Sequence, residues 1–215
     1  MSISLNQIGY SVAHSLGAPN DFFLREKIKL SAVGLRATLI RQDLTRNTLS
    51  KMFLQTVGPL KLICVDASDC PSVVPSGTRL LRTELKIPSP VRTKDNTTFY
   101  YVGTIDKLNG FQETTIDGLW MDSSNRFTSK SPKFYYLEGY IYVVNPPTED
   151  LAWITVVSAF ADPRELADYK CQGADCYSDD SPFPLEMDMW AQMEGLLLRT
   201  YATKPKDEEV RINTD

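Results

Sequence analysis

The sequence predicts an α+β fold in which N- and C-terminal helices pack beside a central, mainly antiparallel β domain. Apolar residues recur at three- and four-residue steps near both ends of the chain, which is the period of an amphipathic helix. Between the ends, short aromatic and β-branched runs alternate with Pro-, Gly- and Asp-rich turns, which is typical of antiparallel strands. The 215 residues, 42% of them hydrophobic, are enough to form a core without a disulfide or metal.

We expect four consecutive parts: a helical segment over residues 1–52, a β-rich domain over 53–162, a helical segment over 163–203 and an extended tail over 204–215. In the first part, Leu5, Ile8, Val12 and Leu16 predict a short helix that residues 17–20 end. A second amphipathic helix is predicted from Asp21 to about Arg46. Gly34 lies in its middle, where glycine is about 0.5–1 kcal/mol less favourable than alanine, and indicates either close packing or a kink.

The β-rich part contains strand-like runs at residues 60–65, 79–87, 99–105, 133–138, 140–144 and 154–160. The two runs around Glu138 and Gly139 predict a β-hairpin. A small sandwich and an open barrel both fit this number of strands. Residues 109–131 are too long for a plain turn and predict a protruding loop or hairpin.

In the last quarter, a short helical turn is expected at residues 164–169, and a longer helix from Leu185 to about Thr203. Pro184 is the expected first residue of that helix, because proline is well tolerated there. Residues 204–215 offer only Val210 and Ile212 for burial. They predict an extended tail that becomes ordered when a partner covers it.

The charge is distributed unevenly along the chain. The formal net charge is −4, which argues against a protein that coats nucleic acid. Residues 1–52 hold seven basic and three acidic side chains, whereas residues 161–215 hold six basic and thirteen acidic ones. Such opposite charges favour docking of the two ends on each other or head-to-tail contact between copies. Two separate solvated faces fit the pattern equally well.

The sequence predicts no catalytic, cofactor or metal site, and therefore no enzyme. His14 is the only histidine, and no Gly-x-Ser-x-Gly, Gly-x-Gly-x-x-Gly or Gly-x-x-x-x-Gly-Lys motif accompanies it. The acidic residues near the last helix lack the spacing of a calcium loop and predict a solvated acidic loop. They are Asp175, Asp179, Asp180 and Glu186.

The four cysteines do not fit a zinc site, because the gap of five residues in the first pair is too long and the two pairs lie about a hundred residues apart. They are Cys64, Cys70, Cys171 and Cys176. No secretory signal is evident, so we expect synthesis in a reducing cytoplasm and thiols rather than bridges. Cys64 is expected in the core, and Cys171 and Cys176 in an exposed or lightly packed loop. The longest apolar run, residues 151–161, is shorter than the roughly 20 residues that cross a bilayer.

A stripe of basic residues on the long N-terminal helix fits either DNA contact or an ordinary solvated face. Its members are Arg25, Lys27, Lys29, Arg36, Arg41 and Arg46.

The order of these parts resembles structural proteins of crAss-like and related short-tailed phages. The resemblance rests on the helix end at residues 39–47, on residues 57–70 and 80–90 of the β region, and on Tyr101-Val-Gly-Thr-Ile-Asp106. It continues through the hairpin at residues 134–144, Phe160-Ala-Asp-Pro163 and the acidic stretch 171–184. It covers most of the chain and includes no catalytic signature.

The resemblance implies a virion protein of the neck that forms a ring or head-to-tail connector below the portal. It implies twelve identical copies, with the portal protein and adjacent tail or ring proteins as partners, around the channel through which DNA leaves. Residues 109–131 and 204–215 are then candidate contact arms. The alternative is a nucleic-acid-binding accessory protein that uses the basic N-terminal helix.

Overall fold

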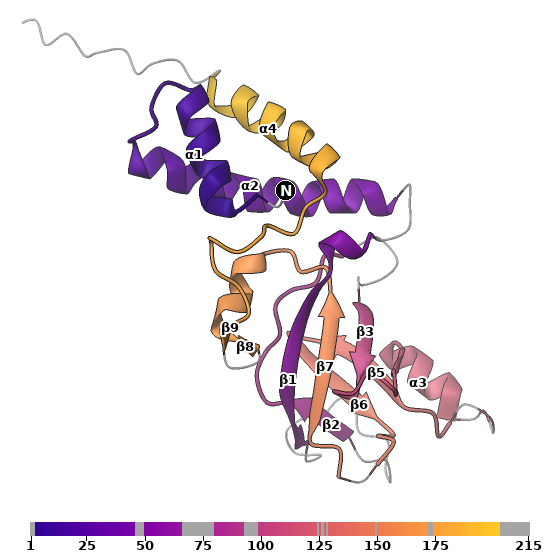
Figure 1. Ribbon diagram of the computed structural model, residues 1–215. Coiled ribbons are helices and arrows are strands. Elements are labelled where there is room, and N and C mark those ends of the chain that lie inside the picture. Colours follow the sequence, from indigo (N-terminus) through magenta and orange to yellow (C-terminus); the bar gives the residue numbers. More distant parts are fainter. Residues whose placement is uncertain are drawn as a thin grey trace, which may run out of the picture.

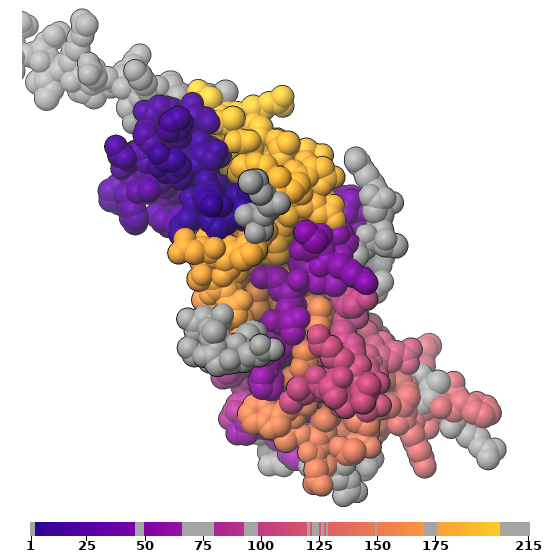
Figure 2. Space-filling model, in the orientation of Figure 1, coloured from indigo at the N-terminus to yellow at the C-terminus, as the bar shows by residue number. Residues whose placement is uncertain are grey.

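The computed structural model describes residues 3–45, 50–65, 80–92, 99–123, 125, 127, 129–148, 150–171 and 174–202. A helical lobe lies at one end of an elongated molecule and a β lobe at the other (Figure 1; Figure 2). The helices come from both ends of the chain, and the sheet comes from its middle. The predicted α+β class is confirmed.

Three helices form the helical lobe: α1 (Leu5–Ser15), α2 (Phe22–Leu44) and α4 (Met187–Ala202). Ser4 begins α1 with a capping box, in which its hydroxyl accepts from the Gln7 amide and the Gln7 side chain accepts from the Ser4 amide. Asp21 caps α2 by accepting from the Leu24 amide. The apolar faces of α1 and α4 pack against α2 in one core.

The last helix begins at Met187, two residues later than predicted. The Leu185 amide donates to the Phe183 carbonyl instead of starting a helical ladder. Pro184 therefore lies in a turn before α4 and not at its first position. The fixed φ of proline suits such a turn as well as it suits a helix start.

Seven strands form one sheet in the order β3-β7-β1-β2-β6-β5-β4. They are β1 (Gln55–Cys64), β2 (Leu80–Thr83), β3 (Phe99–Gly103), β4 (Gln112–Glu113), β5 (Lys133–Leu137), β6 (Tyr140–Val144) and β7 (Trp153–Ser158). Every pairing is antiparallel except that of β4 with β5. The β5–β6 hairpin turns as predicted at Glu138 and Gly139, which have φ values of 52° and 92°.

The two ends of this sheet meet, so the sheet curls into a barrel. Gly110 forms a bridge to Gly103 at the end of β3, and the Phe111 amide donates to the Val102 carbonyl. The chain then continues directly into β4, which pairs with β5. Inside, the ring of Phe99 on β3 meets that of Phe134 on β5 edge-on at 5.5 Å. Closure leaves little unpaired strand edge, which favours a stable separate lobe.

Short elements complete the lobe. Helix α3 (Ile116–Ser123) follows β4 inside the region 109–131 where we predicted a loop or hairpin. The predicted turn at 164–169 is a 3-10 helix, η2 (Pro163–Asp168), and its Leu166 joins the barrel core. The others are η1 (Lys51–Phe53), β8 (Lys170–Cys171) and β9 (Ala174–Asp175). The predicted tail, residues 204–215, lies outside the described residues. Among the described helices, none combines the length and apolar character needed to cross a membrane.

Candidate functional site

The junction between the two lobes is built around Arg36 of α2. This side chain is fully buried. Its Nε donates to the Pro184 carbonyl at 2.8 Å, its Nη1 to the Phe160 carbonyl at 2.5 Å, and its Nη2 to the Phe53 carbonyl at 3.3 Å. The three acceptors lie before α4, after β7 and in η1. One guanidinium thus fastens the long helix to three segments at the top of the β lobe.

Arg36 was predicted on the solvated side of the helix, and that prediction is wrong. The physical reason is that α2 packs against both the other helices and the β lobe, so its solvated side is narrow and does not include Arg36. Burial lowers the pKa of Arg36 to about 10, while Tyr177 and Asp162 act to raise it. The guanidinium therefore stays charged at neutral pH, and it satisfies carbonyl oxygens that would otherwise be buried without a donor.

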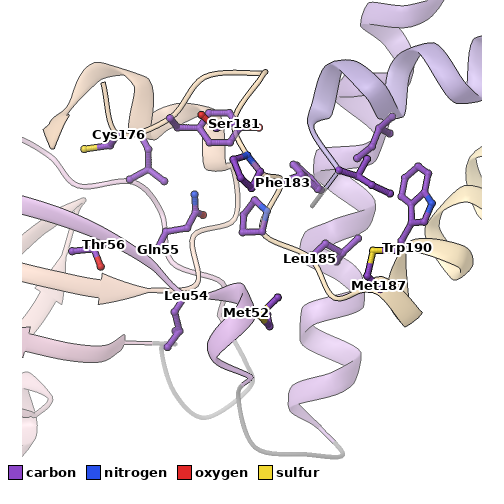
Figure 3. A pocket seen from close by; sticks show the side chains of 16 residues that line it. Met52, Leu54, Gln55, Thr56, Cys176, Ser181, Phe183, Leu185, Met187 and Trp190 are labelled. Atoms are coloured by element: carbon purple, nitrogen blue, oxygen red, sulfur yellow. The ribbon is translucent and has the colours of Figure 1, made fainter. Parts of the chain in front are cut away.

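A groove of about 660 Å³ lies beside this junction (Figure 3). Side chains from η1, the start of β1, the 176–186 linker and α4 line it. Met52 and Met187 lie at its exposed parts, and Leu54, Phe183 and Trp190 add further apolar surface. The described residues that line the groove include no Asp, Glu, Lys, Arg or His. It is suited to apolar contact and offers no acid–base chemistry from charged side chains.

The acidic loop before α4 holds the linker against the helical lobe. The Asp179 carboxylate lies 3.2 Å from Lys29 Nζ, and Asp180 accepts from Asn6 Nδ2 at 2.6 Å. Burial lowers the pKa of Lys29, but hydrogen bonds to Glu26 and Asp179 outweigh this and leave its pKa above the ordinary value. The prediction of a wholly solvated loop is therefore wrong for Asp179. No cluster of three or more potential metal ligands occurs among the described residues.

The predicted basic stripe does not form one surface. Arg36 is buried, and Lys29 is paired with Glu26 at 2.8 Å and with Asp179. Arg25 is half-buried, Lys27 and Arg41 are exposed, and Arg46 lies outside the described residues. Two exposed cations separated by almost four helical turns differ from the continuous charged face that DNA contact favours.

Two cysteines differ from the predictions: Cys64 in its environment and Cys176 in its bonding. Cys64, expected in the core, is exposed, because it is the last residue of β1, whereas Leu62 on the same face of the strand is buried. Cys176 is disulfide-bonded, which contradicts the expectation of a thiol. Its partner sulfur lies outside the described side chains. His14 is exposed on α1, with its ring centroid 6.1 Å from that of Tyr10.

Two exposed apolar surfaces lie on different lobes, and sequence reasoning missed both. On α2, Phe23 is 78% exposed and Leu30 is 60% exposed. On the loop between β3 and β4, Ile105 is 51% exposed and Leu108 is 80% exposed. Exposed apolar groups of this size at fixed positions are typical of protein interaction surfaces. One signal in the sequence could have indicated the surface on α2. Leu30 does not fit the three- and four-residue spacing of Leu24, Ile28 and the other apolar residues of its helix, so it is an apolar residue on the exposed side.

The comparisons with known proteins agree with this picture of an assembly protein. The family model described as phage tail ring protein 2 matches residues 7–215. No curated protein matches the chain. The resemblance to structural proteins of crAss-like phages is confirmed. Because the match covers nearly the whole chain, this protein belongs to the phage tail ring protein 2 family, with a structural role in the virion.

Proposed function

We propose that this protein forms a closed ring in the head-to-tail connector of a phage, below the portal and around the channel through which DNA leaves. The family match over residues 7–215 is the observation that carries the proposal. The ring contains twelve copies, and its neighbours along the axis are the portal protein and adjacent ring or tail proteins. Its role is mechanical and involves no catalysis.

The shape and rigidity of the subunit support this role. A closed ring needs two different surfaces on each copy, held at one fixed angle, because each copy contacts the next through a heterologous interface. Arg36 fixes the two lobes to each other, and exposed apolar residues lie on both lobes. Such an interface needs about 800 Å² per partner to be specific. Residues 109–131 and 204–215 are the proposed contact arms.

The test combines mass measurement of the purified full-length chain with imaging of the particle. The proposal expects a ring between portal and tail, whether or not purified subunits assemble alone. A protein that is absent from the particle and monomeric at every concentration would contradict it. DNA affinity that falls steeply with added salt, measured on that monomer, would instead support the accessory protein.

A further inference from the structure

The loop between β3 and β4 is an unusually well braced turn with an apolar end. We call residues 104–109 the hairpin tip. The Thr104 amide donates to the Asn109 carbonyl at 3.0 Å, and the Lys107 amide donates to the Thr104 carbonyl at 3.0 Å. The Tyr101 hydroxyl lies 3.2 Å from the Thr104 carbonyl oxygen and 3.1 Å from the Asn109 carbonyl oxygen. The backbone of the hairpin tip is therefore held from inside the loop.

Side chains add to this bracing. The Asp106 carboxylate accepts from the Leu108 amide at 3.1 Å and from the Thr104 hydroxyl. A Cβ atom at Gly103 would collide with the Asn109 carbonyl and the Tyr101 hydroxyl, so the tight base of the turn requires glycine. Despite this order, the hairpin tip presents Ile105 and Leu108 to solvent. A rigid loop that displays apolar side chains binds with little loss of conformational entropy, because it is ordered beforehand.

A second surface runs along α2. Phe23, Lys27, Leu30, Gly34, Thr38 and Arg41 are all exposed, and their spacing of three or four residues places them on one side of the helix. We call these six residues the α2 face. At its centre, a Cβ added to Gly34 would meet no described atom within 4 Å beyond the residues next to it and the backbone of its own helix. Internal packing therefore does not explain this glycine, which is unfavourable in a helix interior.

Charge makes the two surfaces complementary. The α2 face carries two basic residues, Lys27 and Arg41, and no acidic one. Residues 99–123, which include the hairpin tip, contain one basic and four acidic residues. On the α2 face, Lys27 and Arg41 flank the apolar centre. In the hairpin tip, Asp106 and the adjacent Lys107 balance each other, so the acidic excess of residues 99–123 comes from Glu113, Asp117 and Asp122 beside the tip in the sequence. Opposite charges around an apolar contact favour encounter and fix its orientation.

We propose that the hairpin tip of one copy packs on the α2 face of the next copy. Ile105 and Leu108 then lie over Gly34, where the surface of the helix carries no side chain. This inference rests on the proposed ring and names the surfaces that close it. The two surfaces lie on different lobes of each subunit, so the contact is heterologous and propagates from copy to copy. The neighbouring α3 and the first turns of α2 extend the contact area beyond the hairpin tip itself.

Zero-length cross-linking tests the pairing in the full-length chain. Leu108→Cys and Leu30→Cys are combined in a background in which Cys64 and the other cysteine outside the disulfide, Cys70 or Cys171, are replaced by serine. Rings formed in solution or taken from particles are then oxidised with copper phenanthroline. On a non-reducing denaturing gel we expect a ladder of covalent multimers that dithiothreitol abolishes. The matched control pairs Leu108→Cys with Leu196→Cys, because Leu196 is also exposed but lies on α4. It should give no ladder.

A second measurement does not depend on cross-linking. The Ile105→Ser/Leu108→Ser double variant should melt at the same temperature as the parent, since both side chains are exposed. It should need about tenfold more protein to form rings, as expected when central apolar contacts are removed. Leu85→Ser, an exposed leucine elsewhere on the β lobe, should leave assembly unchanged.

The outcomes separate the inference from the proposed function. Rings that form with wild-type chain but give no ladder, or an equal ladder with Leu196→Cys, would overturn the pairing while the ring remains. Attachment of Cys at position 108 to a different virion protein would overturn it too. Absence of rings from both solution and particle would remove the proposed function itself.

Discussion

Nη1 of Arg36, in the middle of α2, donates a hydrogen bond to the carbonyl oxygen of Phe160 just after β7. The two residues are 124 positions apart in the sequence, and their contact joins the helical lobe to the segment that follows β7 in the β lobe. A ring requires every copy to hold the same angle between its contact surfaces. This buried contact is the feature of the subunit that fixes that angle.

Replacement of Arg36 should destabilise the protein strongly. Arg36→Met leaves the carbonyls of Phe53, Phe160 and Pro184 without their donor, so we expect a loss of about 3 kcal/mol or more in the free energy of unfolding. Arg41→Met, in the same helix but exposed, should change it by less than about 0.5 kcal/mol. Urea denaturation measures both. Equal effects would show that the junction does not depend on the guanidinium.

Gly34 and Gly195 provide a matched pair of helix substitutions. At neither position would an added Cβ meet a described atom within 4 Å beyond the residues next to it and the backbone of its own helix. Gly34→Ala and Gly195→Ala should therefore each raise the free energy of unfolding by about 0.5–1 kcal/mol, because alanine favours the helix. Thermal melts check this expectation.

A larger side chain separates the two positions. Gly34→Met should keep the monomer folded. Its side chain would occupy the space over position 34 that Ile105 and Leu108 of the next copy require, so the protein concentration needed for ring formation should rise. Gly195→Met should leave assembly as it is. Mass photometry across a concentration series reports both, and normal assembly of Gly34→Met would count against an interface at this face.

Gly103 should be intolerant of any side chain. Gly103→Ala forces the added Cβ against the Asn109 carbonyl and the Tyr101 hydroxyl, so we expect a loss of about 1–3 kcal/mol and weaker ring assembly. Gly110→Ala, whose Cβ would lie 3.3 Å from the Tyr101 ring, is the milder control. If the two variants behave alike, the bracing of the hairpin tip is not what the glycine provides.

Acid should weaken the fold partly through Asp162. Burial raises the pKa of this carboxyl, but hydrogen bonds from the Arg164 side chain and backbone outweigh that effect and leave it below the ordinary value. The unfolded chain therefore binds a proton at higher pH than the folded protein. Stability from this group is present above the ordinary carboxyl pKa of about 4 and is lost as pH falls through the folded value.

Two variants isolate that contribution. Asp162→Asn retains a residue able to cap η2 but removes the titrating group, so the decline in stability between pH 5 and pH 2 should become shallower. Arg164→Met should flatten it less, because the backbone amide at position 164 still donates to Asp162, and the double variant should match Asp162→Asn. Urea midpoints at a series of pH values measure the slopes, and unchanged slopes would assign acid sensitivity to other groups.

Much of the fold follows from local sequence. Asp21 marks the start of α2, and the period of Leu24, Ile28 and Leu39 identifies its buried side. Gly139 marks the β5–β6 turn, because glycine readily accepts positive φ and aromatic and β-branched runs flank it. These features depend on a few neighbouring residues, which is why periodicity and turn chemistry find them.

The assembly-related features depend on distant residues. Arg36 has the charge and spacing of a surface residue, and only the approach of η1, β7 and the linker turns it inward. The closing contact of Phe111 with Val102 is a single bridge with no periodic pattern. Likewise, Leu108 is exposed because its loop is braced at Thr104 and Asp106, and a hydropathy pattern contains no information about that bracing.

Cryo-electron microscopy of the particle neck tests the central claim most directly. We predict a closed ring of twelve copies between portal and tail, surrounding the DNA channel, with the hairpin tip of each copy against the α2 face of the next. A neck reconstruction that accounts for all density without this chain, or that contains it as isolated copies making no contact with one another, would contradict the account.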